Sequence, residues 1–275
     1  MSTFGERLRA AMDERGPLCA GIDPHASLLS QWGLNDDIAG LERFALTAAE
    51  AFGPTAAAIK PQSAFFERHG SRGIAVLERT IEACRAAGAQ VILDVKRGDI
   101  GSTAQGYADA YLDQSAPMAV DAITASPYLG FGSLAPMIET ARRNDAGVFV
   151  LALTSNPEAA TLQRSVMPSG DSVAGSILSE LAALNAGETF GSFGAVVGAT
   201  IEKPDASLAI NGPLLVPGIG AQGGTAEDVR RIFAGALDLV VPSSSRELLS
   251  AGPDVTALAA AVRRAADEFR AVVSA

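Results

Sequence analysis

Two acidic residues and a lysine follow a short apolar run in this sequence. Asp94, Lys96 and Asp99 lie in the stretch DVKRGDIGST, directly behind the apolar residues 91–93. Because side chains alternate along a strand, Asp94 and Lys96 are expected on one face and Val95 on the other. Burying both charges is costly unless they pair or face a substrate. The spacing therefore predicts a charged site at the end of a buried strand, with a network that only fills the protein interior as the alternative.

The two preceding apolar runs also end in charged residues. Asp23 follows the first run, and its carboxylate could accept hydrogen bonds from sugar hydroxyls, although an Asp before a proline is common in turns. Lys60 closes the second run, where a solvated face explains an ammonium less readily. Three successive runs thus present Asp23, Lys60 and the pair of Asp94 and Lys96, which indicates that these side chains share one site.

A glycine-rich stretch late in the chain has the composition of an anion-binding loop. It reads PGIGAQGG over residues 217–224 and precedes the helix-capping pattern TAED at 225–228. Glycines let backbone N–H groups approach an anion, and a helix N-terminus adds its dipole. The stretch also satisfies the dinucleotide pattern GxGxxG, but no acidic residue ends the next strand. A mononucleotide or sugar phosphate fits better, with Arg246 as a phosphate partner unless it is an ordinary surface residue.

Short apolar runs alternate with helical patterns along almost the whole chain, which is typical of βα units around a parallel sheet. The runs and the chain length predict an α/β fold, a single-domain (β/α)8 TIM barrel over residues 1–275, with an open doubly wound sheet as the alternative. Loops after the strands build the active site of such a barrel. The predicted strands are 18–23, 56–60, 91–96, 119–125, 148–154, 195–200, 214–217 and 237–242.

Further segments complete this architecture. Thr3 and Glu6 form a capping box before an amphipathic N-terminal helix, which is expected to cap the barrel. A long polar connection, about 156–171, follows the fifth predicted strand and is predicted to be an inserted loop. Helices are predicted at 38–52, 74–87, 134–143, 173–186 and 226–234, with a closing helix from 254 onward.

The composition excludes several classes of protein. The formal net charge is −10, and no basic run interleaves with aromatic residues, so nucleic acid is not an expected partner. No apolar run is long enough for a membrane span and the N-terminus lacks a signal-peptide core, which favours a cytoplasmic protein. Cys19 and Cys84 are interpreted as buried structural thiols, and His25 and His69 as residues without a chemical role, so no metal site is expected.

Seven short motifs stand in order along the chain. They are GIDP at 21–24, KPQSAFFE at 60–67, DxKxxDI at 94–100, TASPYLG at 124–130, TSNP at 154–157, VPGIGAQGG at 216–224 and SR at 245–246. In these motifs the sequence resembles the orotidine 5′-phosphate decarboxylase family, in the long-loop form of actinobacteria and myxobacteria. The resemblance covers nearly the whole chain.

The resemblance implies decarboxylation of orotidine 5′-monophosphate to uridine 5′-monophosphate, the last step of pyrimidine nucleotide synthesis. It also implies a homodimer without metal or organic cofactor. Without an electron sink, the negative charge left at pyrimidine C6 must be met by preorganised charges, such as a buried ammonium. Lys96 would stabilise the carbanion and protonate C6. Asp94 would lie beside the leaving carboxylate, acting by repulsion or by orienting the lysines, while Lys60 and Asp99 extend the network.

The resemblance also implies which residues bind the substrate. Asp23 would bind the ribose hydroxyls and Ser126 the pyrimidine edge. Gln222 and Arg246 would hold the phosphate, and this remote binding would supply energy for loop closure and catalysis. The residues assigned to substrate binding are Asp23, Ile100, Thr103, Ser126, Pro217, Gly220, Gln222 and Arg246, of which Ile100 and Thr103, with Asp99, would reach the neighbouring subunit's site.

Two other functions compete with this interpretation. A magnesium-dependent sugar-phosphate decarboxylase or aldol-type synthase of the same barrel superfamily would share the Asp-x-Lys-x-x-Asp core but require a metal. A catalytically silent ligand-binding barrel would have lost Asp94, Lys96 or Asp99, and all three are present. Arg97 and Gly98 differ from the more widespread short forms of the family and receive no role.

Overall fold

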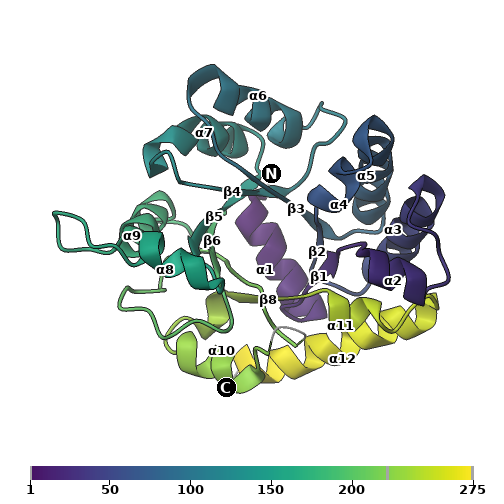
Figure 1. The fold of residues 1–275 in the computed structure, drawn as a ribbon. Coiled ribbons are helices and arrows are strands. Elements are labelled where there is room, and N and C mark those ends of the chain that lie inside the picture. The colour runs from purple at the N-terminus through teal and green to yellow at the C-terminus, as the bar shows by residue number, and fades with distance from the viewer. Residues whose placement is uncertain (1, 221–222, 274–275) are drawn as a thin grey trace.

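Eight parallel strands close into a barrel in the computed structural model, which describes residues 2–220 and 223–273 (Figure 1). Each strand pairs with the next along the chain, and β8 pairs with β1 to close the ring. The strands are β1 (Cys19–Ile22), β2 (Ala58–Pro61), β3 (Gln90–Arg97), β4 (Ala122–Ala125), β5 (Gly147–Leu153), β6 (Phe193–Val197), β7 (Leu214–Val216) and β8 (Val240–Ser244). The predicted (β/α)8 barrel is confirmed, and the open sheet is excluded.

Helices surround the barrel in the order expected of βα units (Figure 1). Residues 198–213, all of which are described, connect β6 to β7 without a helix. None of the helices among the described residues has both the length and the apolar character needed to cross a membrane. The longer helices are α1 (Phe4–Arg15), α3 (Ile38–Phe52), α5 (Gly70–Ala86), α6 (Gly101–Leu112), α7 (Ala135–Arg143), α9 (Val173–Leu184), α10 (Ala226–Ile232) and α12 (Val255–Val273), and the short ones are α2 (Ala26–Gln31), α4 (Ala64–Glu67), α8 (Ala160–Gln163) and α11 (Arg246–Leu249).

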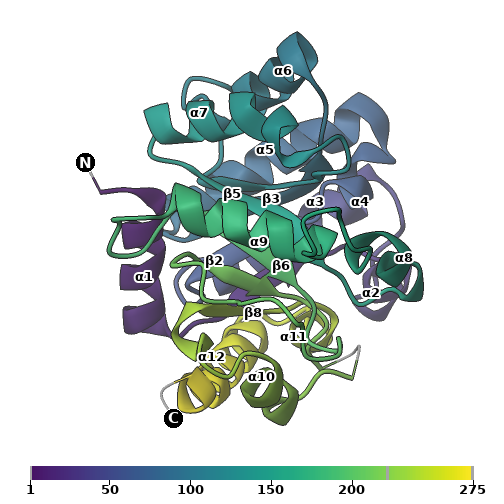
Figure 2. The ribbon, with the colours of Figure 1, turned by 90° about the vertical axis from the view of Figure 1, so that its left-hand side faces the viewer.

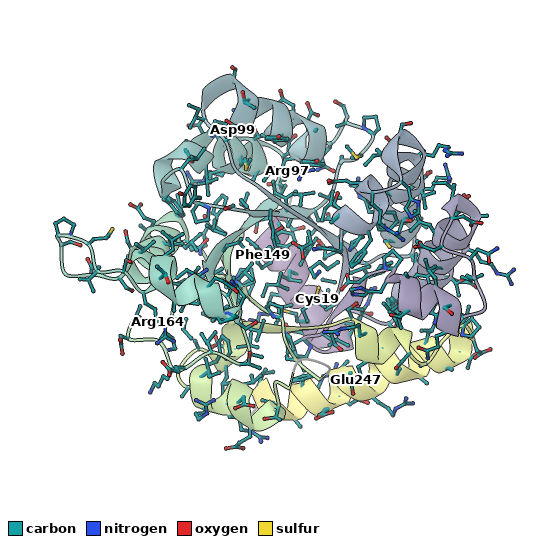
Figure 3. All side chains as sticks on the ribbon, in the orientation of Figure 1. Cys19, Arg97, Asp99, Phe149, Arg164 and Glu247 are labelled. Carbon is teal, nitrogen blue, oxygen red and sulfur yellow. The ribbon has the colours of Figure 1, made fainter. Side chains whose placement is uncertain are left out.

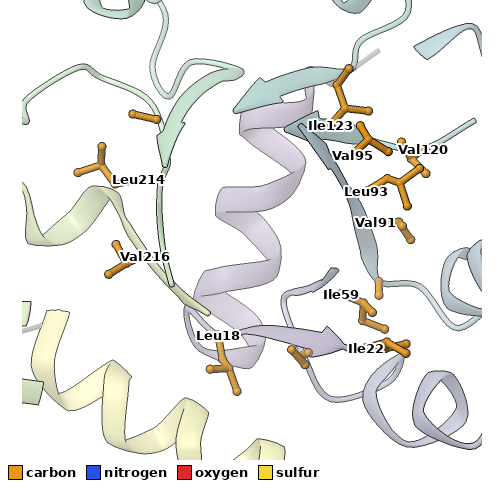
Figure 4. Close-up of a cluster of buried hydrophobic side chains, with 14 of the residues drawn as sticks. Leu18, Ile22, Ile59, Val91, Leu93, Val95, Val120, Ile123, Leu214 and Val216 are labelled. Atoms are coloured by element: carbon orange, nitrogen blue, oxygen red, sulfur yellow. The ribbon is translucent and has the colours of Figure 1, made fainter. Parts of the chain in front are cut away.

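Side chains of β3 alternate as their sequence predicts. Val91, Leu93 and Val95 belong to the cluster between the barrel and its helices, which Figure 4 shows in part. Ile92, between them, belongs to a second cluster inside the barrel. The face opposite the helices is therefore the one that carries Asp94, as expected from the two-residue period.

Helix α1 lies across the end of the barrel where the strands begin (Figure 2). Its Phe4 side chain meets Phe149 of β5 edge-on, with ring centroids 6.0 Å apart. Arg7 forms an ion pair with Asp121 at 3.0 Å, and the same carboxylate accepts the backbone N–H of Val91 at 2.9 Å. The predicted capping box of Thr3 and Glu6 is present. Since α1 covers this end, the strands' carboxyl ends face the open side.

Several predicted boundaries differ from the structure by up to four residues, and two predicted segments contain a different kind of element. The eighth strand was predicted at 237–242, but Leu237–Leu239 forms a 3-10 turn and the strand begins at Val240. Leu239 is buried within that turn, which explains why the apolar run starts before the strand. The polar connection at 156–171 is partly helical, because it contains a 3-10 turn at Pro157–Ala159 and helix α8.

Candidate active site

A cavity of about 510 Å3 opens at the carboxyl ends of the strands. All eight strands, or the loops that follow them, contribute to its wall. The fold therefore collects residues from distant parts of the sequence around one space, as a (β/α)8 barrel requires. Six of the predicted site residues line the cavity, namely Asp23, Lys60, Asp94, Lys96, Pro217 and Arg246.

Asp94 is the centre of the charged cluster in this cavity. One of its carboxylate oxygens accepts a hydrogen bond from Lys60 Nζ at 3.0 Å. The other accepts hydrogen bonds from Lys96 Nζ at 2.6 Å and from the Thr124 hydroxyl at 2.8 Å. The side-chain amide nitrogen of Gln62, oriented to donate, lies 2.7 Å from Asp94 Oδ2, the oxygen that also accepts Lys60. Asp94 thus holds two ammonium groups in fixed positions, and we call Lys60, Asp94 and Lys96 the charged triad.

A bulge in β3 gives the triad its shape. Leu93 pairs with Ile123 of β4 and Arg97 pairs with Ala125, so residues 94–96 stand opposite Thr124 alone. The Thr124 hydroxyl accepts the backbone N–H of Lys96 at 2.9 Å. Lys96 itself has a left-handed backbone, with φ of 46°, which is unusual for a residue other than glycine. Bulges near active sites commonly re-aim a side chain, and this one turns the Lys96 side chain back toward Asp94.

The two lysines differ in exposure. The side chain of Lys60 is 8% exposed, whereas that of Lys96 is 44% exposed and reaches into the open cavity. The sequence led us to expect both Asp94 and Lys96 to be buried, and this is wrong for Lys96. The reason is the bulge, which carries residue 96 out to the mouth of the barrel.

Charge pairing fixes the ionisation states of Asp94 and Lys60, the two buried members of the triad. Burial alone would raise the pKa of Asp94, but the ammonium groups of Lys60 and Lys96 hold this pKa well below its ordinary value. Burial alone would lower the pKa of Lys60, but the Asp94 and Asp23 carboxylates hold it above its ordinary value. At neutral pH the site therefore contains an ionised Asp94 and a protonated Lys60.

Asp23 stands on the other side of Lys60. Its carboxylate lies 4.0 Å from Lys60 Nζ. The buried oxygen Oδ1 accepts no hydrogen bond from the described residues. Asp23 also lines the cavity, where a carboxylate can accept a hydroxyl donor from a bound molecule. The sugar-binding role of Asp23 stays a prediction.

The first three residues of the glycine-rich stretch, 217–219, and Arg246 form another part of the wall. Pro217, Gly218 and Arg246 line the cavity, and Gly218 has φ of 97°, a conformation that favours glycine. Gly220 does not line the cavity, and its backbone N–H already donates to Gly224 at 3.0 Å. The predicted phosphate contact at Gln222 falls outside the described residues.

Besides Gly220, four predicted residues do not line the cavity. Asp99 accepts the backbone N–H of Ile100 at 2.8 Å, and Ile100 is 62% exposed at the start of α6. Figure 3 places Asp99 beside α6, outside the strand ring. Thr103 lies on α6, and none of these three residues lines the cavity of their own chain. Ser126 also lies outside it, with its backbone N–H bonded to Arg97.

Sequence reasoning missed several residues that line the cavity. His25 was expected to have no role, but it lies in the wall and its ring packs against Phe65 with centroids 4.3 Å apart. Thr124 lies in the recognised TASPYLG motif but received no role of its own, and the structure shows that its hydroxyl joins the two ends of the bulge. Ser155 lies in the recognised TSNP motif and lines the cavity where Ser126 does not.

Among the residues that the structure describes, no group of three or more His, Cys, Asp or Glu side chains is arranged to hold a metal ion. The triad instead alternates positive and negative charge, with each ammonium bonded to Asp94. Such a site is suited to stabilising charge that develops on a bound molecule, because its charges are oriented before the reaction begins.

Comparison with known proteins finds similarity over most or all of the chain. Residues 16–261 match the model of the orotidine 5′-phosphate decarboxylase / HUMPS family. An orotidine 5′-phosphate decarboxylase of Streptomyces coelicolor is 60% identical over all of both chains. One from a Nocardioides species is 63% identical, covering 93% of this chain and 95% of its own.

A solved structure agrees with these sequence matches. The crystal structure of a provisionally assigned orotidine 5′-phosphate decarboxylase from Streptomyces avermitilis has a TM-score of 0.98 and 58% identity, covering 100% of this chain and 97% of that chain. Sequence, fold and charged site thus agree, and the chain belongs to the orotidine 5′-phosphate decarboxylase family.

Proposed function

We propose that the charged triad decarboxylates orotidine 5′-monophosphate to uridine 5′-monophosphate and carbon dioxide, the last step of uridine nucleotide synthesis. The enzyme is a carboxy-lyase. The observation that carries this proposal is the pair of ammonium groups held on the two oxygens of one buried carboxylate. When the bond from C6 to the carboxyl carbon breaks, its electron pair stays on C6. Lys96 donates a proton to that carbon and later regains one from solvent.

The two lysines have separate tasks in this reaction. Lys96 is the proton donor, because its side chain extends into the cavity and is 44% exposed. Lys60 is a permanent positive charge, because its buried ammonium lies between Asp94 and Asp23. Asp94 keeps both ammonium groups in place and lies beside the carboxylate that leaves. Charges fixed in advance stabilise the C6 carbanion without reorganising when it forms.

The cavity wall suggests how the nucleotide is oriented. Asp23 accepts hydrogen bonds from the ribose hydroxyls, since its carboxylate lines the cavity. Arg246 and the 217–224 stretch, including Gln222, hold the phosphate. For the pyrimidine edge we assign Ser155 in place of Ser126, because Ser155 lines the cavity and Ser126 does not.

A homodimer in the cytoplasm completes the proposal. Asp99, Ile100 and Thr103 face away from their own cavity, and we assign them to the site of a second copy. Large exposed apolar side chains follow the paired strands β3 and β4, since Ile100 is 62% exposed, Tyr128 75% and Leu129 52%. Such side chains are common where another protein binds. A cytoplasmic location fits an enzyme of nucleotide synthesis.

The first test is the loss of orotidine 5′-monophosphate absorbance on adding purified protein in EDTA. Wild type should turn the substrate over, and Lys96→Ala should not. Lys203→Ala is the matched control, because Lys203 is an exposed lysine outside the cavity and its loss should leave kcat unchanged. No turnover by folded wild type would overturn the proposal in favour of the metal-dependent sugar-phosphate enzymes. Turnover of this nucleotide only after magnesium is added would overturn the metal-free mechanism while the substrate assignment stands.

A further inference from the structure

Arg97 is the residue at which the bulge of β3 ends, and it does not line the cavity. Its side chain lies on the outer side of the strand ring, away from the interior where Cys19 and Phe149 are found (Figure 3). Its backbone carbonyl accepts the N–H of Ser126 at 2.8 Å, so the strand pairing resumes here. Arg97 is thus fixed at the residue after Lys96 without touching the space that substrate would occupy.

The guanidinium of Arg97 joins three elements. Nη1 donates to the carbonyl oxygen of Val95, inside the bulge, at 3.2 Å. Nη2 donates to the carboxylate of Glu67, at the end of α4, at 2.6 Å. The group also lies over the ring of Tyr107 of α6, 5.6 Å from the ring centroid. A planar guanidinium can make these contacts together, whereas an ammonium on a flexible stem cannot.

Glu67 is itself held by a second donor to the same carboxylate oxygen. Its carboxylate accepts the hydroxyl of the buried residue Ser63 at 2.5 Å. The backbone N–H of Ser63 in turn donates to the carbonyl of Asp94 at 3.3 Å. Burial works against ionisation of Glu67, but the bonds from Ser63 and Arg97 lower its pKa. The chain of contacts therefore runs from Arg97 through Glu67 and Ser63 back to the first residue of the bulge.

These contacts surround Lys96, the residue of the triad whose backbone is strained. A left-handed conformation at a lysine persists only where the surroundings impose it. Thr124 restrains the bulge from the barrel interior, through Lys96 N–H and Asp94. Arg97 and Ser63 restrain it from outside, through the Val95 and Asp94 carbonyl groups.

We propose that Arg97, anchored by Glu67, is a positioning residue for decarboxylation, which holds the bulge so that Lys96 points at the reacting carbon. This inference rests on the proposed function of Lys96 and adds a residue that acts through it. Loss of the contact lets residues 95–97 relax and moves the Lys96 ammonium from its place. Because the phosphate and ribose contacts come from other strands, ground-state binding is unaffected.

The test measures kcat and KM separately for Arg97→Met, Arg97→Lys and Glu67→Gln. For Arg97→Met we expect kcat to fall about 10- to 100-fold with KM within about threefold, since small misplacements of a reacting group have effects of this size. Arg97→Lys should recover only part of the loss. Arg68→Met is the matched control, because Arg68 follows Glu67 but pairs with Asp36 at the surface, and its kcat should equal that of wild type.

Two further measurements separate positioning from a general loss of structure. Arg97→Met combined with Glu67→Gln should lose no more than the worse single variant, because both changes act on one ion pair. A uridine 5′-monophosphate analogue with an anionic oxygen on C6 should bind Arg97→Met at least tenfold more weakly than wild type, while uridine 5′-monophosphate binds both equally. If Arg97→Met does not fold, Glu67→Gln and Arg97→Lys carry the same expectations.

The outcomes distinguish the two proposals. Wild-type kcat in folded Arg97→Met, or a raised KM at unchanged kcat, overturns the positioning role while the decarboxylase assignment stands. Failure of wild type itself to decarboxylate overturns the assignment, and the inference falls with it. A fall in kcat at constant KM, with selective loss of affinity for the C6-anionic analogue, supports the inference.

Discussion

The Thr124 hydroxyl is used twice, as acceptor for the Lys96 backbone N–H and as donor to Asp94. Thr124→Val has almost the same shape but lacks this hydroxyl. We expect kcat to fall about tenfold and the free energy of unfolding to fall by about 1–3 kcal/mol, because a buried N–H and a carboxylate each lose a partner. Steady-state kinetics and urea denaturation measure the two effects.

Thr124→Ser is the control for this change, since it keeps the hydroxyl and removes only a methyl group. Its kcat should remain within about threefold of wild type. Equal losses of kcat in the Val and Ser variants would show that packing at this position matters and that the hydroxyl does not.

Asp94 and Lys60 should make the stability of the protein depend on pH only at the extremes. The pKa of Asp94 is lowered in the folded state, so its contribution is present above the unfolded value of about 3.9 and is lost as pH falls through the folded value. The pKa of Lys60 is raised, so its contribution is present below about 10.4 and is lost as pH rises through the folded value.

The corresponding measurement compares wild type with Asp94→Asn by urea denaturation from pH 3 to pH 10. Removing the carboxylate leaves the Lys96 ammonium unpaired and the buried Lys60 ammonium with only Asp23, 4.0 Å away, so Asp94→Asn should be less stable by about 3 kcal/mol at neutral pH. This difference should be constant between about pH 5 and pH 10 and should shrink below about pH 4. A difference that varies steadily through neutral pH would contradict the assigned charges.

At the scale of elements, α1 and the beginnings of β3 and β4 are joined by one carboxylate. Asp121 accepts Arg7 of α1 and the N–H of Val91. Asp121→Ala should lower the free energy of unfolding by about 3 kcal/mol, because it leaves a buried donor and a partly buried guanidinium without their partner. The kcat of the folded variant should be unchanged, since the site lies at the other end of the barrel.

Urea denaturation and the initial rate of the same preparation check this prediction. Asp13→Ala provides the control, because Asp13 pairs with Arg9 on the exposed side of α1 and its side chain is 68% exposed. Its stability should stay within about 0.5 kcal/mol of wild type. A loss of kcat in stable Asp121→Ala would mean that the two ends of the barrel communicate.

The order and type of these elements follow from the sequence, but their local irregularities do not. Alternating apolar runs identified the eight strands, because burial on both faces leaves a strong signal. The same rule assumes an unbroken ladder, so it placed Lys96 in the interior and could not anticipate the bulge at 94–96. Thr124 was missed for a related reason, since a threonine inside a strand is ordinary until the residues opposite it are known.

At the scale of the whole molecule, some of the predicted site residues meet within one chain and others do not. Asp94 and Lys96 meet within the chain because neighbouring residues of one strand are close in any fold. Asp99 is five residues beyond Asp94 yet lies outside the cavity, so its expected role depends on a second copy. The sequence of one chain does not show directly which of its surfaces a second chain would cover.

The dimer can be tested by mixing two inactive variants. Asp99→Ala loses a residue assigned to the neighbour's site, and Lys96→Ala loses one from its own. A mixed dimer contains one intact site, so co-expression in equal amounts should restore about a quarter of wild-type kcat, as random pairing in a twofold dimer requires. Each variant expressed alone serves as the control. No recovery in demonstrated mixed dimers would place Asp99 in its own chain's site or outside catalysis.

The alkylation rates of the two buried cysteines can show how the fold opens. Cys19 lies inside the barrel and Cys84 among the helices around it, and burial raises the pKa of each thiol to about 12. Since only the thiolate reacts with alkylating reagents, neither should be labelled while the fold is closed. The labelling rate of Cys84 therefore reports separation of α5 from the barrel, and that of Cys19 reports rupture of the ring of strands. Equal labelling rates for Cys19 and Cys84 would mean that the outer helices and the ring of strands open as one unit.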